Sequence, residues 1–93
     1  MKNVQEYLDL LGFEVQDAVT RFKGVVTSIA FDLPGCVQAS VNQAISKEGK
    51  LGETYWFDVN RLTKISKKPV MKRPEFLFEI ADVPGPVLKP VRR

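Results

Sequence analysis

The sequence contains no histidine and only one cysteine, Cys36. Histidine is the usual proton carrier near neutral pH and the commonest metal ligand, and disulfides or thiolate metal sites need more than one cysteine. We therefore predict no bound metal, no internal disulfide and no histidine-based catalytic group. A lone cysteine is most often a small buried apolar side chain, and we expect this role for Cys36 in place of a reactive thiol.

Long apolar runs are missing as well. No segment is apolar for the length that a membrane-spanning helix needs, and Glu6 and Asp9 interrupt the apolar residues near the amino terminus. The scarcity of cysteine fits a reducing compartment. These features predict a soluble cytoplasmic protein with no membrane-spanning segment.

Motifs for catalysis or cofactor binding are also lacking. The acidic residues in the middle of the chain lie beside predicted turns and loops, where solvated carboxylates are ordinary. Gly49 and Gly52 have neither the spacing nor the strand-to-helix setting of a phosphate-binding loop. We therefore predict no cofactor and no enzyme activity.

Positive charge is concentrated at one end of the chain. Residues 1–62 carry six Lys or Arg and eight Asp or Glu, whereas residues 63–93 carry eight positive and three negative side chains. The formal net charge of +3 therefore comes from the carboxyl-terminal segment. This layout disfavours a phosphate-binding face on the first 62 residues and favours an electrostatic role for the tail.

The chain is otherwise a series of short segments separated by turn residues. Residues 4–11 have apolar side chains at helical spacing, with Asn3 as a cap and Gly12 as a stop, and predict a helix. The alternating segments predict strands at residues 16–20, 25–31, 36–41, 54–59 and 63–66. Residues 32–35 have the composition of a tight turn, and residues 60–62 predict a single 3-10 turn before the last strand.

Alternation within these strands assigns side chains to the core. In residues 25–31, the odd-numbered positions share one face of the strand and the even-numbered positions share the other. Tyr55, Phe57 and Val59 are expected to share one face of the fourth strand, and the residues expected to point inward outside residues 25–31 are Val19, Val37, Ala39, Val41, Phe57, Val59, Leu62 and Ile65. We expect the middle of residues 42–53 to form a solvated loop, with Ile45 and Leu51 anchoring its two ends.

One long strand, a central hairpin and a one-turn helix before the last strand are typical of SH3-like barrels. We therefore predict a mainly β protein with three parts. Residues 1–14 form a short helix and lead-in, residues 15–66 form a five-stranded SH3-like barrel, and residues 67–93 form a proline-rich, basic, extended arm. Because a core of this size is modest, we expect the flanks to pack on the barrel or on a second copy of the chain.

Three stretches carry a resemblance to known proteins. They are residues 17–27, residues 31–36 and the run Trp56-Phe57-Asp58-Val59-Asn60-Arg61-Leu62. Together they resemble uncharacterised small SH3-like-barrel proteins of phages, prophages and mobile gene cassettes, and the general outline is similar to Tudor-like and KOW-type barrels. The resemblance implies the fold and a mobile-element setting, and it assigns no functional residue.

The fourth predicted strand and the turn after it supply the candidate binding residues Tyr55, Trp56, Asp58 and Arg61. An exposed Trp can anchor a ligand, stack on a base or hold a cation; the alternative is that Trp56 packs under the helix or the tail. Asp58 and Arg61 are spaced for a polar recognition pair, and the alternative for them is a local ion pair or cap.

The arm carries two further candidate sets. Phe76, Phe78 and Ile80 would share one face of an extended segment, which predicts contact with the chain's own sheet or with that of a neighbouring copy. The candidate phosphate contacts are Lys64, Lys67, Lys68, Lys72 and Arg73.

Three functional hypotheses follow. The leading one is a small non-enzymatic protein-interaction module from a mobile element, which binds a protein partner or forms a homo-oligomer. The alternative is a nucleic-acid-binding barrel that uses the basic arm, with Trp56 stacking on a base. The third is an enzyme built from oligomerised barrels around a shared pore, by analogy with small plasmid-borne SH3-like reductases.

Overall fold

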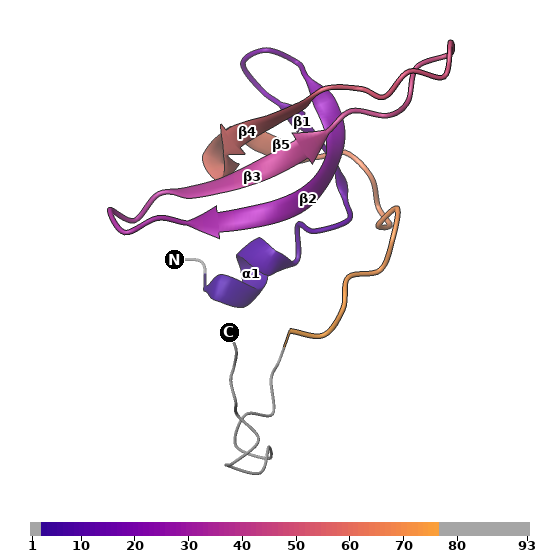
Figure 1. The fold of residues 1–93 in the computed structure, drawn as a ribbon. Helices are drawn as coiled ribbons and strands as arrows, with labels where there is room; N and C mark the ends of the chain where they lie inside the picture. The colour runs from indigo at the N-terminus through magenta and orange to yellow at the C-terminus, as the bar shows by residue number, and fades with distance from the viewer. Residues whose placement is uncertain (1–2, 77–93) are drawn as a thin grey trace, which may run out of the picture.

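Residues 3–76 are described by the structure, a computed structural model (Figure 1). They form one five-stranded antiparallel sheet in the order β4-β3-β2-β1-β5, so the predicted mainly β class is confirmed. The elements are α1 (Val4–Leu8), β1 (Glu14–Asp17), β2 (Lys23–Phe31), β3 (Val37–Asn42), β4 (Thr54–Asp58), the 3-10 helix η1 (Val59–Arg61) and β5 (Leu62–Lys64). Within residues 3–76, β4 and β5 are the two ends of the sheet, and no ladder between them closes a barrel.

β2 is the long curved strand that joins the two halves of the sheet (Figure 1). Its residues 23–25 pair with β1, and its residues 25–31 pair with β3. The register shifts between Val26 and Ser28, which leaves Thr27 as the extra residue of a β-bulge. Because the bulge buries Val26 and leaves Ser28 exposed, the predicted regular alternation along this strand is wrong.

The core lies on one face of the sheet. Its buried apolar residues are Val15, Val26, Ala39, Val41, Phe57 and Val59. The amino-terminal segment covers this face, since Tyr7, Leu10 and Leu11 pack against the core. Tyr7 also meets Phe31 edge to face, with 5.9 Å between the ring centroids. The inward positions predicted for β3 and for the turn after β4 are confirmed, because Ala39, Val41 and Val59 belong to this core and Val37 and Leu62 pack against it.

α1 begins where the sequence predicts and ends earlier. The Asn3 side chain accepts from the N–H of Glu6, and the Glu6 carboxylate accepts from the N–H of Asn3, both at 3.0 Å. This capping box fixes the start of the helix. The helix ends at Leu8 rather than Leu11, and turns carry the chain to Gly12, where φ is +89°.

Residues 65–76 run back along the amino-terminal segment in the opposite direction. The N–H of Ile65 donates to the carbonyl of Glu14 at 2.8 Å, and the N–H of Val70 donates to the carbonyl of Gly12 at 2.7 Å. Farther along, Arg73 forms an ion pair with Asp9 at 2.9 Å. Residues 65–76 therefore pack on the amino-terminal segment of the same chain. Phe78 and Ile80 lie outside the described residues.

Several residues expected inside are exposed. β1 ends at Asp17, because the side chain of Asp17 caps the following turn, and Val19 lies on that turn with 70% of its surface exposed. Cys36 is exposed because it precedes β3, at the exit of the turn over residues 32–35. The predictions of a buried Val19 and a buried Cys36 are therefore wrong.

The loop between β3 and β4 extends away from the sheet (Figure 1). Its tip is held by its own hydrogen bonds, including one of 2.8 Å from the N–H of Ser46 to the carbonyl of Lys50. Ile45 and Leu51 are exposed because no part of the core lies beside them, so the predicted anchoring is wrong. Ile65 follows β5 and is also exposed, so the prediction that it points inward is wrong.

No helix within residues 3–76 has the length and apolar composition of a membrane span.

Candidate functional site

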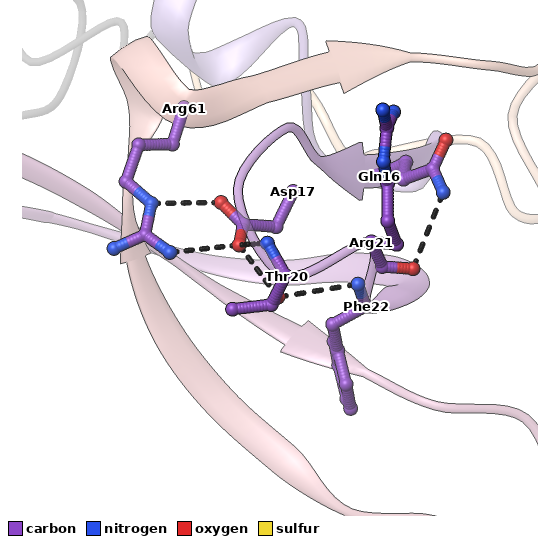
Figure 2. A network of polar contacts seen from close by, with 6 residues as sticks. All are labelled: Gln16, Asp17, Thr20, Arg21, Phe22 and Arg61. Atoms are coloured by element: carbon purple, nitrogen blue, oxygen red, sulfur yellow. Dashed lines mark hydrogen bonds and ion pairs between the residues drawn. The ribbon is translucent and has the colours of Figure 1, made fainter.

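The turn between β1 and β2 is built on Asp17, whose side chain is fully buried. Its Oδ2 accepts from the N–H of Thr20 at 2.7 Å and from the hydroxyl of Thr20 at 2.6 Å. The same hydroxyl oxygen accepts from the N–H of Phe22 at 3.2 Å. These bonds fix the conformation of the turn and the position of Phe22, the residue at its end (Figure 2).

Arg61, at the end of η1, is the second support of this turn. Its Nε donates to Oδ1 of Asp17 at 2.8 Å and its Nη2 donates to Oδ2 at 2.7 Å, so the pair is bidentate (Figure 2). The hydrogen bonds from Arg61 hold the pKa of Asp17 well below its ordinary value of 3.8, against the opposing effect of burial. Hydrogen bonding to Asp17 likewise raises the pKa of Arg61, which keeps the guanidinium charged.

Arg21 occupies the last position of the turn with φ at +69°, in the left-handed region. Its backbone is tied on both sides. The N–H donates to the carbonyl of Asp17 at 2.8 Å, and the carbonyl accepts from Nε2 of Gln16 at 3.2 Å. This conformation reverses the chain between Thr20 and Phe22.

Phe22 meets two aromatic residues of β4. Its ring lies edge to face with that of Tyr55, with 5.3 Å between centroids and 83° between planes. The ring of Phe57 lies 5.6 Å away at 35°, and the guanidinium carbon of Arg61 sits 5.5 Å from the centre of the Phe57 ring. The turn and β4 therefore form one continuous aromatic surface.

This surface borders a groove of about 440 Å³, which we call the aromatic groove. Its lining consists of Thr20, Arg21, Phe22, Tyr55, Trp56, Phe57 and Arg61. Tyr55 and Trp56 are 49% and 50% exposed. The hydroxyl of Tyr55 donates to the Glu53 carboxylate at 2.5 Å, which orients the ring and raises the pKa of Tyr55.

Three of the four predicted binding residues meet in the groove: Tyr55, Trp56 and Arg61. Asp58 does not line it, because the carboxylate of Asp58 caps η1 by accepting from the N–H of Asn60 at 2.8 Å. Asp58 is therefore a local cap, one of the alternatives that its spacing suggested. Arg61 takes its acidic partner from β1 instead.

Sequence reasoning missed Phe22 and Arg21. Phe22 carried a signal, because it is a large aromatic residue placed in a predicted reversal between Arg21 and Lys23. An aromatic side chain in a turn needs an apolar surface to contact, and β4 supplies that surface here. The pairing of Arg61 with Asp17 had no local signal, since 44 positions separate the two residues.

The five residues predicted to contact phosphates differ in whether their charged groups already contact another side chain. Nζ of Lys64 lies 3.9 Å from the centre of the Phe13 ring, and Arg73 is paired with Asp9, so the charge of Arg73 is already compensated. Lys67, Lys68 and Lys72 are exposed. A hollow of about 420 Å³ beside the arm is lined by Lys64, Lys72 and Arg73 together with Asp9 and Glu75, so the lining carries both signs of charge.

Phe76, the one described member of the predicted arm contacts, lies beside α1. It lines a third hollow of about 560 Å³ together with Val4, Leu8, Ile29 and Phe31.

Within residues 3–76, no group of three or more Cys, Asp or Glu side chains is placed to hold a metal ion. Comparison of the chain with protein-family models, with curated proteins and with solved structures found no match.

Proposed function

We propose that this chain is a small SH3-like module that binds a protein partner through the aromatic groove. The strand order β4-β3-β2-β1-β5 and the 3-10 helix before β5 support the SH3-like assignment. The resemblance of three sequence stretches to small phage and mobile-cassette proteins supports a mobile-element setting.

The observation that carries the proposal is the aromatic surface itself. Protein interfaces concentrate binding energy on a few Trp, Tyr and Arg residues that surround a pocket. Here Trp56, Tyr55 and Arg61 line one groove, with Phe22 as part of its wall. The buried Asp17 fixes Arg61, and Glu53 fixes Tyr55, so little side-chain entropy remains to be lost when a partner binds.

Selection from a displayed library of random peptides tests this function. Peptides selected on the wild-type chain are expected to bind Trp56→Ala and Tyr55→Ala at least about tenfold more weakly, because each change removes an exposed wall of the groove. Leu51→Ala, an exposed apolar residue on the β3–β4 loop, is the matched control and should leave the affinity unchanged. Selected peptides that bind Trp56→Ala and Tyr55→Ala as tightly as the wild type would overturn the proposal.

A second candidate function rests on a separate observation. Lys67, Lys68 and Lys72 are exposed, and none of them forms an ion pair with another residue in the described part of the chain. Such a run of free charge is suited to the phosphates of a nucleic acid. A gel-shift titration at several salt concentrations tests this, and the absence of a shift at low salt would exclude it.

A further inference from the structure

We infer that residues 77–80 of the same chain occupy the apolar hollow between α1 and β2 and extend the sheet along the open edge of β2. This hollow has a volume of about 560 Å³ and shares no lining residue with the aromatic groove. The inference therefore does not depend on the proposed function. It assigns a second interaction surface and names its occupant.

The lining of the hollow contains no charged side chain. α1 contributes Val4, Gln5 and Leu8, and β2 contributes residues 27–29 and Phe31. α1 has no buried residue, and Val4 and Phe31 remain 55% and 48% exposed. Because apolar surface remains uncovered on both walls, an apolar occupant would gain free energy by burying it.

β2 also has an open edge beside this hollow. Val26 is the last residue of that edge with backbone partners: its carbonyl accepts from the N–H of Gly12 at 2.9 Å, and its N–H donates to the carbonyl of Phe13 at 3.1 Å. Beyond Val26, the side of β2 opposite β3 has no backbone partner among residues 3–76. Such an edge is a template for another extended segment, which would gain main-chain hydrogen bonds there.

The chain itself arrives at this hollow. Arg73 donates to Oε1 of Gln5 at 3.0 Å and pairs with Asp9 at 2.9 Å, which fixes the arm against the amino-terminal segment. Three positions later, Phe76 lines the hollow and is half-buried. Residues that follow Phe76 directly have a high effective concentration at the hollow, and a segment from another molecule would have to compete with them.

The sequence after Phe76 has the pattern that the hollow requires. Phe78 and Ile80 follow Phe76 at every second position, so all three share one side of an extended segment. Glu79 falls on the opposite side, where its carboxylate can stay in water. An extended segment therefore places apolar side chains in the hollow without burying a charge.

The more distant part of the arm is less suited to the hollow. Residues 84–90 include three prolines, which have no N–H to donate to the edge of β2. Lys89, Arg92 and Arg93 would bring charges to an uncharged lining. Residues 77–80 contain neither proline nor basic residues, and at about 3.3 Å per residue they match the length of the open edge over residues 28–31.

Nuclear magnetic resonance on the full chain, labelled with ¹³C and ¹⁵N, tests the inference. We expect nuclear Overhauser contacts from the side chains of Phe78 and Ile80 to the methyl groups of Leu8 and Ile29. A mixture of labelled and unlabelled chains, recorded with a filter that keeps only contacts between the two, should not contain these signals. Their absence there is expected because the occupant belongs to the same molecule.

Phe78→Asp is the decisive variant, because a carboxylate would lose its hydration in the uncharged hollow. We expect the amides of residues 28–31 that face the open edge to exchange with solvent at least about tenfold faster in this variant than in the wild type. Val87→Asp makes the same kind of change farther along the arm and is the matched control, with no expected effect. Unchanged exchange at Ala39 and Val41, which are buried in the core, shows that Phe78→Asp still folds.

The remaining outcomes overturn the inference. Missing contacts between residues 77–80 and the hollow, or equal exchange in Phe78→Asp and the wild type, would show that these residues do not occupy it. Contacts that appear only in the filtered spectrum would reassign the hollow to the arm of a second copy. In each case the peptide selection on the aromatic groove decides the proposed function separately.

Discussion

Arg61 closes a bidentate ion pair with Asp17 across 44 positions of sequence. The pair joins the 3-10 helix before β5 to the turn after β1, and the N–H of Ala18 adds a bond of 2.8 Å to the carbonyl of Arg61. Only the Asp17 carboxylate is buried, and its two oxygens accept hydrogen bonds from Arg61 and Thr20, while 40% of the Arg61 side chain is exposed. The aromatic groove is thus supported by the same contact that joins two distant parts of the sheet.

The stability of the protein should fall in acid through Asp17. Its pKa is lower in the folded chain than the ordinary value of 3.8, so the stabilisation is complete above that value and is lost as the pH falls toward the depressed pKa. We expect the melting temperature, followed by circular dichroism, to fall below pH 4 in the wild type. Asp17→Asn should melt at a lower temperature at neutral pH and show a flatter acid limb. An acid limb as steep in Asp17→Asn as in the wild type would contradict this assignment.

Gly24 should not tolerate a side chain. A Cβ built there would overlap the carbonyl oxygen of Asn42 on β3. We expect Gly24→Ala to destabilise the fold by roughly 1–3 kcal/mol in urea denaturation, as overpacking typically does. Gly49→Asn is the control, since Gly49 has open space around it and asparagine accepts its positive φ. Similar losses in the two variants would show that the close approach at Gly24 is not the cause.

Neighbouring residues of β4 should differ sharply in their contribution to stability. Phe57 is buried in the core, and Phe57→Ala should cost about 3–5 kcal/mol. Trp56 is half-exposed, so Trp56→Ala should cost less than about 1 kcal/mol, within the range of surface substitutions. Guanidinium denaturation with circular dichroism detection measures both variants. A large loss in Trp56→Ala would mean that Trp56 is covered by another segment, which would leave less of it available to a partner.

Cys36 should react readily with a thiol reagent while the protein is folded, because its side chain is exposed. A disulfide reagent with a coloured leaving group is expected to titrate one thiol per chain in native buffer, and added denaturant should increase the rate only slightly. Reaction that requires unfolding would show that Cys36 is protected.

Much of the fold was predictable because it depends on local chemistry. Asn3 and Glu6 form the capping box that starts α1, and Gly35 has a φ of +100° in the predicted turn. The alternation of Val37, Ala39 and Val41 correctly gives the inward face of β3, since Ala39 and Val41 belong to the core and Val37 packs against it. Each of these features is determined by residues within a few positions of one another.

The errors arise where distant residues or an inserted residue decide the outcome. The bulge at Thr27 reverses the faces of β2 downstream of Val26, and alternation alone gives no indication of an extra residue. The Asp17 side chain ends β1 by capping the turn through Thr20, which leaves Val19 exposed, whereas the pairing of Asp17 with Arg61 depends on a contact that only the folded sheet creates. The sequence therefore predicts only part of the aromatic groove: it indicates the residues on β4 and gives no indication of those on the turn opposite β4.

The sheet order also determines when this protein can finish folding during its synthesis. β1 lies between β2 and β5, so the first strand to leave the ribosome waits for the last before its second edge is paired. The β2–β3–β4 meander consists of neighbouring hairpins and can form while the chain is still growing. Until Arg61 emerges, Asp17 has no counter-charge, and its carboxylate accepts hydrogen bonds from Thr20 alone. The aromatic groove is therefore among the last parts of the molecule to form. Truncated chains that end before η1 would contain its aromatic residues but would not form the groove.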